Sequence, residues 1–243
     1  MKNNATSIIF SVAIVLAAYV FGNAIINRNN LESTISVTGS GVANFTSDLI
    51  VWEGSFSKES ENLKDAYADL EKDKKIISDY LISKGIATDE FVFNAVQSRT
   101  KNKALYSNDG KYMGEKFLGY VLTQSMQIDS KNVEKVEKVS REITELLNKG
   151  IQFYSQPPRY YYTKLADLKI EMISTATADA KLRAENIASN SGGGLGKLIS
   201  AQMGVFQITG LNSKEDYSWG GTFNTSSKEK TASITMKLTY KVD

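Results

Sequence analysis

The longest helical pattern of hydrophobic and polar positions in the chain lies between Leu165 and Lys197. Its apolar residues recur three and four positions apart, which places them on one face of a helix. Four of them are alanines spaced four apart, so the face is narrow and lets a sheet or another helix approach closely. We therefore expect a buried packing helix. The residues of this face are Ala166, Ile170, Ile173, Ala176, Ala180, Ala184, Ile187 and Ala188.

The rest of the chain after residue 33 alternates between strand and helix patterns. This order predicts an α+β fold in which βαβ-like units build antiparallel or mixed sheets packed against helices. The strand at 48–57 is apolar on both sides and is expected inside a sheet. The predicted strands are 34–39, 48–57, 90–98, 117–128, 151–154, 198–208 and 231–242, and the predicted shorter helices are 59–84 and 129–148.

Glycines and polar segments mark the boundaries of these elements. Gly85 and Gly150 stand where helices end, because glycine readily adopts the left-handed conformation of a helix C-cap. Residues 39–47 are a predicted turn, and the Asn108-Asp109-Gly110 segment is the turn of a predicted hairpin. Residues 209–230 are rich in glycine, serine and asparagine and predict a long loop.

In each of the two shorter helices the apolar residues form one stripe, which is expected to be buried. Lys74 interrupts the first stripe, and we expect its aliphatic stem to pack while its ammonium group reaches solvent. The stripes consist of Leu63, Ala66, Tyr67, Leu70, Ile77 and Leu81 in the first helix and Val133, Val136, Ile143 and Leu147 in the second.

An apolar segment, residues 7–26, follows a short polar N-terminus. A helix of this length, at 1.5 Å per residue, spans roughly the 30 Å hydrocarbon core of a bilayer. The segment is longer than the core of a usual signal peptide and no small-x-small cleavage site follows it. It is therefore typical of an uncleaved signal anchor, with a cleaved signal peptide as the alternative. The predicted anchoring residues are Ile8, Ile9, Phe10, Val12, Ile14, Val15, Leu16, Tyr19, Val20, Phe21, Ile25 and Ile26.

This anchor sets the expected organisation of the chain. Lys2 and the amino terminus favour a cytoplasmic location for residues 1–6, which leaves the bulk of the chain outside the inner membrane. Residues 27–33 are a predicted linker, and residues 34–243 a predicted exported domain.

Composition limits the chemistry available to the chain. Twenty-nine Lys and Arg residues against 27 Asp and Glu give a formal charge of +2 without long runs of one sign, so nothing indicates nucleic-acid binding. The chain has no histidine and no cysteine. This excludes Ser-His-Asp and Cys-His nucleophilic sites, ordinary zinc sites, haem and iron–sulfur ligation, and disulfides. We expect no catalytic residue, no metal and no cofactor, and an enzyme is the least favoured class.

The glycine-rich segment 191–198 raises the alternative of a phosphate loop. Such a loop follows a strand and begins a helix, whereas this one follows a helix and precedes a strand. Leu198 also stands where a serine or threonine would bind magnesium. We therefore interpret the segment as a helix cap and a tight turn. The acidic residues of the helix at 59–84 are interleaved with lysines, which predicts a solvated face with ion pairs rather than a cation site.

Several pieces of the chain together resemble the SIMPL-domain family of bacterial envelope proteins. They appear in the family's order between residues 34 and 242. Two features depart from the family pattern. Family members usually have a proline before the aspartate matched by Asp48, where this chain has Ser47. Their central loop is also usually rich in proline and tyrosine, unlike the loop of this chain. The matching pieces are Ile35–Gly41, Gly85-Ile86, Gly119-Tyr120, the alanine-rich helix from Ala176 to Ala188, Gly193–Gly196 and the closing strand.

The resemblance implies an α+β fold, export beyond the inner membrane and, in some members, self-assembly into large hollow rings. It also implies an association with envelope maintenance and tolerance of oxidative stress. It supplies no catalytic residues, because the family has no agreed catalytic activity.

Two groups of side chains are candidate contacts with another subunit or a partner. Leu168 and Leu182 are placed roughly opposite the alanine face of the long helix, where a monomer would leave them in water. The second group is mainly aromatic and comes from two segments. One segment, residues 159–162, has a basic residue followed by three tyrosines, and the other is the long loop. For the first segment, half-buried aromatics at a strand edge are the alternative to a ligand or lipid-interface surface. The group consists of Arg159, Tyr160, Tyr161, Tyr162, Tyr217, Trp219 and Phe223.

The sequence thus predicts a single-pass protein of the bacterial inner membrane, with its main domain in the periplasm and no enzymatic activity. Its expected partners are the bilayer, through the N-terminal helix, and further copies of itself in a large homo-oligomeric ring or cage. The alternative is a monomeric or dimeric exported module that recognises a ligand or protein through its aromatic loops. If the signal is cleaved, the protein is soluble in the periplasm.

Overall fold

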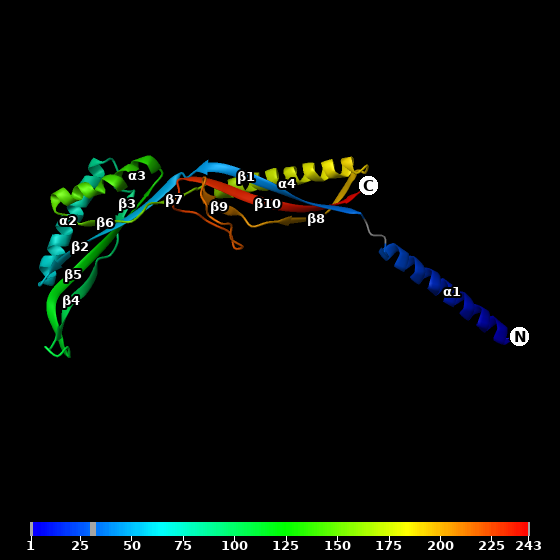
Figure 1. The fold of residues 1–243 in the computed structure, drawn as a ribbon, viewed down its shortest axis with the longest axis horizontal. Helices are drawn as coiled ribbons and strands as arrows, with labels where there is room; N and C mark the ends of the chain where they lie inside the picture. The colour runs from blue at the N-terminus through cyan, green and yellow to red at the C-terminus, as the bar shows by residue number, and fades with distance from the viewer. Residues whose placement is uncertain (1, 30–32, 243) are drawn as a thin grey trace. The chain divides into compact units, whose positions relative to one another are not determined.

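The computed structural model describes the backbone of residues 2–29 and 33–242, and the side chains of residues 8–25 and 33–242 (Figure 1). Its residues group into two compact units, described in turn below. The strand ladders are antiparallel and helices pack on them, which confirms the predicted α+β class. Unit 1 consists of Met1–Gly41, Ile173–Gly204 and Thr235–Asp243, and unit 2 of Val42–Met172 and Val205–Ile234.

The N-terminal helix α1 (Lys2–Asn29) is exposed along its apolar segment. The stretch Ile8–Ile25 has a mean hydropathy of 2.3 and none of it is buried. It is long and apolar enough to cross a membrane, a property that signal sequences share. The helix continues through residues 27–29, which the sequence assigned to a linker. Met1, residues 30–32 and the side chain of Ile26 lie outside the described residues.

Unit 1 contains a sheet in the order β1-β10-β8, on which the alanine-rich part of α4 lies (Figure 1). Ala176, Ala180, Ala184 and Ala188 are all buried. A Cβ atom on Gly39 of β1 would lie 2.3 Å from the Ala176 carbonyl oxygen and from the Ala180 amide nitrogen. Helix and strand backbones therefore touch here, which confirms the predicted close approach. The bounds are β1 Thr34–Thr46, α4 Leu165–Asn190, β8 Leu195–Met203 and β10 Glu229–Val242.

The predicted turn at residues 39–47 is wrong, because β1 continues without a break to Thr46. Gly39 and Gly41 are buried at alternating positions of this strand. At Gly39 a glycine is required because a helix covers the strand, and not because the chain reverses there. Sequence alone cannot separate these two uses of glycine.

The buried side of α4 differs from the predicted one near its N-terminus. Leu168 is 9% exposed and Met172 2%, whereas Ile170 and Ile187 are 69% and 47% exposed and Ala166 is also exposed. The buried residues of α4 recur at every fourth position. Because four residues turn a helix by about 400°, the line that joins the buried residues moves about 40° around the helix at each step. Leu168 therefore falls on the buried side, and its predicted exposed position is wrong.

Unit 2 contains a six-stranded sheet around β2, which has neighbours along both edges as predicted. Ile50, Trp52 and Phe56 point from β2 into a core that helices α2 and α3 cover, and all three are fully buried. Trp52 lies opposite Ile128 of β5. The bounds are β2 Leu49–Ser60, α2 Leu63–Ser83, β3 Phe91–Phe93, β4 Gln97–Tyr106, β5 Tyr112–Ser130, α3 Val133–Glu142, the 3-10 helix η1 Ile143–Lys149, β6 Phe153–Ser155, β7 Arg159–Tyr161 and β9 Gln207–Gly210.

The helix C-caps were predicted correctly and the N-termini were not. Gly85 and Gly150 have φ angles of 83° and 74°, as C-cap glycines do. The two helices begin several residues later than predicted, at N-caps formed by Asn62 and Asn132, whose side chains accept hydrogen bonds from backbone amides. The strands before them run further than their apolar pattern, to Ser60 and Ser130.

The predicted helical stripes are buried only in part. Leu63 and Tyr67 are 43% and 50% exposed, although Ala66 between them is fully buried, so the buried stripe is narrower here than predicted. Leu147 is 59% exposed, because the chain tightens into a 3-10 helix from Ile143 and the side chains that follow are rotated off the stripe. The ammonium of Lys74 lies 5.7 Å from the centre of the Phe93 ring, in agreement with its predicted position at the edge of the core.

We predict that Gly39→Val destabilises the chain by about 3 kcal/mol or more, because the added side chain overlaps the backbone of α4. Thr38→Val is the matched control, since Thr38 is exposed on the other face of the same strand and valine suits strands. Its effect should stay within about 0.5 kcal/mol. Urea unfolding of the full chain in detergent, followed by circular dichroism, measures both. Equal midpoints for the two variants would contradict the close contact.

Candidate functional site

The Arg159–Tyr162 segment is part of the unit 2 sheet rather than a free surface. β7 pairs with β2, with Tyr160 opposite Ile50. Tyr160 is 8% exposed and belongs to the core, so its predicted role as a contact residue is not available in this fold. Arg159 forms an ion pair with Glu53 of the neighbouring strand. Tyr161 and Tyr162 are half-buried, in agreement with the strand-edge alternative.

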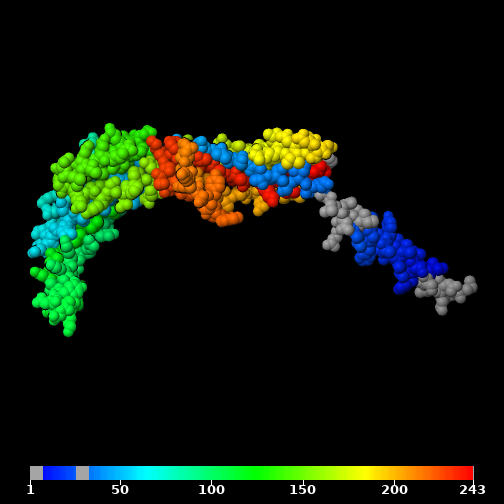
Figure 2. All heavy atoms as spheres, in the orientation of Figure 1, coloured from blue at the N-terminus to red at the C-terminus, as the bar shows by residue number. Residues whose placement is uncertain are grey.

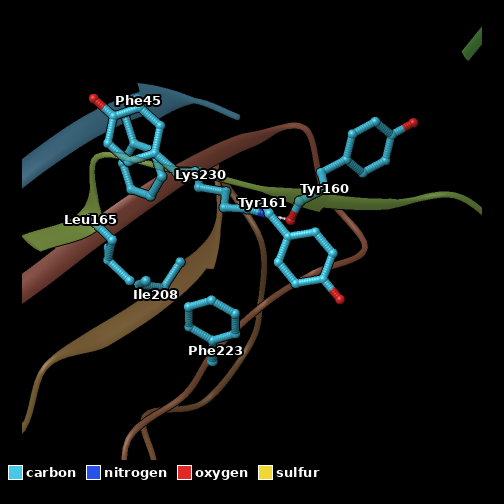
Figure 3. Close-up of a pocket in the computed structure, with 8 residues that line it drawn as sticks. Phe45, Tyr160, Tyr161, Leu165, Ile208, Phe223 and Lys230 are labelled. Carbon is cyan, nitrogen blue, oxygen red and sulfur yellow. Dashed lines mark hydrogen bonds between the residues drawn. The ribbon is translucent and has the colours of Figure 1, made fainter. Parts of the chain in front are cut away.

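A small aromatic cavity lies beside this segment (Figure 3). Figure 3 shows Phe45, Leu165, Ile208, Phe223 and Tyr161 around it, with the aliphatic stem of Lys230 along one side. The Phe45 and Tyr162 rings contact each other with centroids 4.8 Å apart. The space open to water is about 10 Å³, which is room for a single water molecule. In this conformation the cavity is a packing detail and excludes a larger ligand.

Lys230 is the unusual residue of this region. It is 2% exposed, and its Nζ donates hydrogen bonds to the carbonyl oxygens of Tyr160 at 3.0 Å and Ser227 at 2.6 Å. Burial lowers the pKa of its ammonium group from 10.5 to about 8, and the charge of Glu215 partly offsets this effect. Lys230 thus ties β10 to β7 and to the end of the long loop.

The burial of Lys230 was not predicted, although the sequence carries a signal for it. Along the closing strand, Ala232, Ile234, Met236 and Leu238 alternate with polar residues, a pattern that places them on the inner side. Lys230 is in phase with them, so strict alternation places it on the same inner side. A charged residue in phase with core positions is the pattern that marks a buried lysine.

The loop at residues 211–228 is held firmly by hydrogen bonds. The Gln207 side chain binds both ends of a turn, with its Nε2 donating to the Ser218 carbonyl and its Oε1 accepting from the Thr222 amide, each at 2.7 Å. The Glu215 carboxylate accepts hydrogen bonds from the Gly210 amide and from the Asn224 side chain. These bonds lower the pKa of Glu215, so the carboxylate stays charged.

This ordered loop displays aromatic side chains to solvent. Trp219 is 99% exposed and Tyr217 68%, whereas Phe223 lines the cavity on one side and is 55% exposed. An indole that makes no packing contact, on a loop held in place by its own hydrogen bonds, is a preformed contact point. Tryptophan is also among the residues enriched at the centres of protein interfaces.

The remaining candidate contact, Leu182, is 57% exposed on α4 within unit 1. Leu168, its predicted neighbour on the outer face, is buried. Among the residues that the structure describes, the predicted contacts therefore form a cavity cluster at residues 160–162 and 223, a loop tip at residues 217 and 219, and a single leucine on the long helix.

The glycine-rich segment forms the turn that the sequence predicted. Gly192 has a φ angle of 79°, and the Gly193 amide donates to the Ala188 carbonyl at 3.1 Å, which ends α4. β8 begins at Leu195, and Lys197 is exposed on it. The segment leads from a helix into a strand and so lacks the helix N-terminus that binds phosphate. Within the described part of the chain, no group of three or more acidic side chains is placed to hold a metal ion.

We predict that the buried charge of Lys230 makes stability depend on pH. The unfolded lysine binds its proton up to about pH 10.5 and the folded one only up to about pH 8, so stability rises across that interval. The rise attributable to Lys230 is about 2 to 4 kcal/mol. Lys230→Met removes it, and Lys237→Met, at an exposed position of the same strand, keeps it. Chemical unfolding between pH 7 and 10.5 tests this, and parallel curves for the two variants would contradict it.

Comparison with known proteins places these features in a family. The family model described as SIMPL, protein of unknown function (DUF541), matches residues 35–242. A search of curated proteins finds no match. The matched region includes both units after the N-terminal helix, with the Gly39 contact, the alanine-rich helix, the aromatic loop and the closing strand. The chain belongs to the SIMPL family.

Proposed function

We propose that this protein is a non-enzymatic scaffold of the bacterial cell envelope, anchored in the inner membrane by α1, with its SIMPL domain in the periplasm. In this proposal the domain self-assembles into a large ring- or cage-like homo-oligomer that supports envelope integrity or tolerance of oxidative stress. The family match and the apolar N-terminal helix are consistent with a membrane-anchored envelope protein.

The fully exposed Trp219 is the observation that carries the proposal. Burying an aromatic side chain of this size stabilises a contact by a few kcal/mol. The Gln207 and Glu215 hydrogen bonds already fix the loop, so little further conformational entropy is lost when a partner covers it. A second copy of the chain satisfies this requirement without any other component.

The edge strand β8 supplies a second apolar surface that a subunit contact would cover. Among the described strands, β8 pairs only with β10, so its other edge has free backbone groups. Leu198, Ile199 and Met203 on this strand are each about half exposed, at 51%, 48% and 57%. Exposed apolar edge strands favour association with another chain. Repeated contacts of modest strength are sufficient to hold a large closed assembly.

The lack of enzymatic activity in this proposal follows from the chemistry available. The chain has no histidine or cysteine, and the buried Lys230 faces a cavity with room for one water molecule. The second candidate function is a monomeric or dimeric binding module, in which Tyr217 and Trp219 contact a different protein. The same exposed loop supports it.

We predict that the full chain extracted in mild detergent has the mass of a large homo-oligomer, measured by light scattering with size exclusion. Trp219→Ser should lower this mass, because the substitution removes the apolar contact without touching the hydrogen bonds of the loop. The matched control is Tyr67→Ser, at an exposed aromatic residue on α2. A monomeric wild-type particle would contradict the scaffold. An unchanged mass for Trp219→Ser, with loss of binding to a co-purified protein, would favour the binding module.

We further predict that Leu182→Asp lowers the oligomer mass, because a carboxylate on the outer side of α4 would be desolvated in a subunit contact. Ile170→Asp is the control on the same helix and should keep the wild-type mass, because Ile170 is more exposed, at 69% against 57%, and points about 120° away from Leu182 around the helix. Both variants should keep the circular dichroism spectrum of the wild type. If neither mass changes, the outer face of α4 does not contribute to assembly.

A further inference from the structure

Residues 101–119 form a two-stranded arm in unit 2, called here the hairpin arm. β2 ends at Ser60 opposite Tyr120, so beyond that point β4 and β5 pair only with each other. All ten residues of β4 are exposed. Figure 1 shows the two strands continuing past the sheet to their turn, and Figure 2 shows the arm as a narrow green projection at the lower left. Two strands without a third strand or a covering helix are only marginally stable in water.

Glycines shape the arm where it leaves the sheet. Gly119 has a φ of 137° and lies beside a register shift, and a Cβ atom there would be 2.5 Å from the Ser60 carbonyl oxygen. Gly114, with a φ of 110°, lies at a second shift nearer the tip. Such bulges bend and twist a hairpin and are over-represented at functional edges. The arm is therefore a defined feature of the fold and not a frayed end.

One face of the arm carries its aromatic rings, and on the same face the Asn102 side chain donates a hydrogen bond to the Glu115 carboxylate. Residues directly opposite each other in a ladder share a face, and Tyr106 lies opposite Tyr112 while Asn102 lies opposite Phe117. The Tyr106 and Tyr112 rings have centroids 6.0 Å apart, and the Phe117 ring lies 5.2 Å from that of Tyr120 at the base of the arm. Tyr106 and Tyr112 are 65% and 59% exposed.

The opposite face is basic, and its charges are not balanced. Lys103 lies directly opposite Lys116, and like charges in this position repel each other. Lys101, on the same face, forms an ion pair with Glu59. Within the described residues, no carboxylate lies within ion-pair distance of Lys103 or Lys116. An anionic partner would relieve this repulsion.

We infer that the hairpin arm binds the surface of a bilayer that contains anionic lipid. A hairpin with tyrosines on one face and lysines on the other suits the headgroup region, where aromatic rings enter the boundary with the acyl chains and lysines reach the phosphates. A polyanion such as a nucleic acid would pair with the lysines and leave the tyrosines in water. A second copy of the chain would have to bring an acidic surface to Lys103 and Lys116. Charge and apolarity together therefore fit a lipid surface best.

The experiment uses the full chain with one cysteine introduced at the tip, Asn108→Cys, labelled with a dye whose emission shifts to the blue in apolar surroundings. The chain has no other cysteine, so the label is unique. The protein is reconstituted in phosphatidylcholine vesicles or in vesicles that also contain phosphatidylglycerol. Protein-free vesicles of either composition are then added to the phosphatidylcholine sample. Phosphatidylglycerol in the reconstituted vesicles tests whether the arm binds the protein's own bilayer. Phosphatidylglycerol in the added vesicles tests whether the arm binds a second bilayer.

We expect a blue shift only where phosphatidylglycerol is present, in at least one arrangement, and we expect salt to weaken it. Lys111 is exposed beside the turn of the arm. The triple variant Lys103→Glu, Lys111→Glu and Lys116→Glu should bind at least a hundredfold more weakly, because each lysine near an anionic surface contributes about fivefold. Tyr106→Ser with Tyr112→Ser should lose the blue shift. The matched control reverses three exposed lysines outside the arm, Lys75, Lys131 and Lys138, and should leave binding unchanged.

Three results would overturn the inference. The first is a label that does not respond to phosphatidylglycerol in either arrangement, and the second is a response that the triple variant retains. In the third, a pyrene label at the same cysteine shows excimer emission in neutral vesicles, so the arm contacts a second copy instead. A monomeric particle in detergent would contradict the proposed scaffold and leave this lipid assay unaffected, so the two proposals fail separately.

Discussion

The contact between α4 and β1 is the constraint on which unit 1 depends. Helix and strand backbones touch at Gly39, so the strand tolerates no side chain there and the helix no side chain larger than alanine at the facing positions. Four alanines bury little apolar area compared with leucines or phenylalanines. Stability must come instead from the many short dispersion contacts that close approach allows. This explains why the alanines repeat every fourth residue, and why the same pieces of sequence carry the family resemblance.

Unit 2 is stabilised in a different way, by large side chains. Trp52 and Phe56 are fully buried between the sheet and its helices. Polar links then hold the helices together, such as Lys84, whose Nζ lies 2.9 Å from carboxylate oxygens of both Glu142 and Glu145. With its core filled, the unit leaves room for one water molecule in the cavity beside Tyr161. Its larger hollows, about 350 Å³ beside Phe91 and Phe93 and about 460 Å³ beside Asp48 and Lys131, are open to solvent. Its features that point to function are therefore on the surface.

Periodicity predicted the elements well and their ends poorly. Alternation of apolar and polar residues identified β2 and β10, and helical spacing identified α2, α3 and α4, because burial on one side leaves a direct mark on sequence. Strand ends such as residues 40–46 and 101–106 carry no such mark, since they are polar or rich in glycine. Their strand structure comes from pairing with a neighbour, which a single sequence does not show.

The exposure of a candidate contact residue was predicted correctly where it depends only on the polar residues around it in the sequence. Trp219 and Leu182 were placed in solvent correctly, because each lies among polar residues of a loop or a helix face. Leu168 was misplaced, because its burial depends on the drift of the buried line around α4. Tyr160 is on a strand, as the strand-edge alternative predicted, but the pairing of β7 with β2 buries it more completely. Both effects belong to the tertiary structure.

The three exposed surfaces differ in chemistry, and this difference decides what each is suited to bind. The exposed side chains of Trp219 and of Leu198, Ile199 and Met203 on β8 are apolar, and Lys197 is the one charged residue of that strand. A protein surface, including another copy, therefore covers them at little electrostatic cost. The hairpin arm combines tyrosines with Lys103 and Lys116, whose repulsion a neutral protein surface would increase by removing water. If the chain assembles by the proposed apolar contacts, this arm therefore stays free for an anionic surface. The proposed assembly and the proposed lipid binding use different residues, so neither contact would compete with the other.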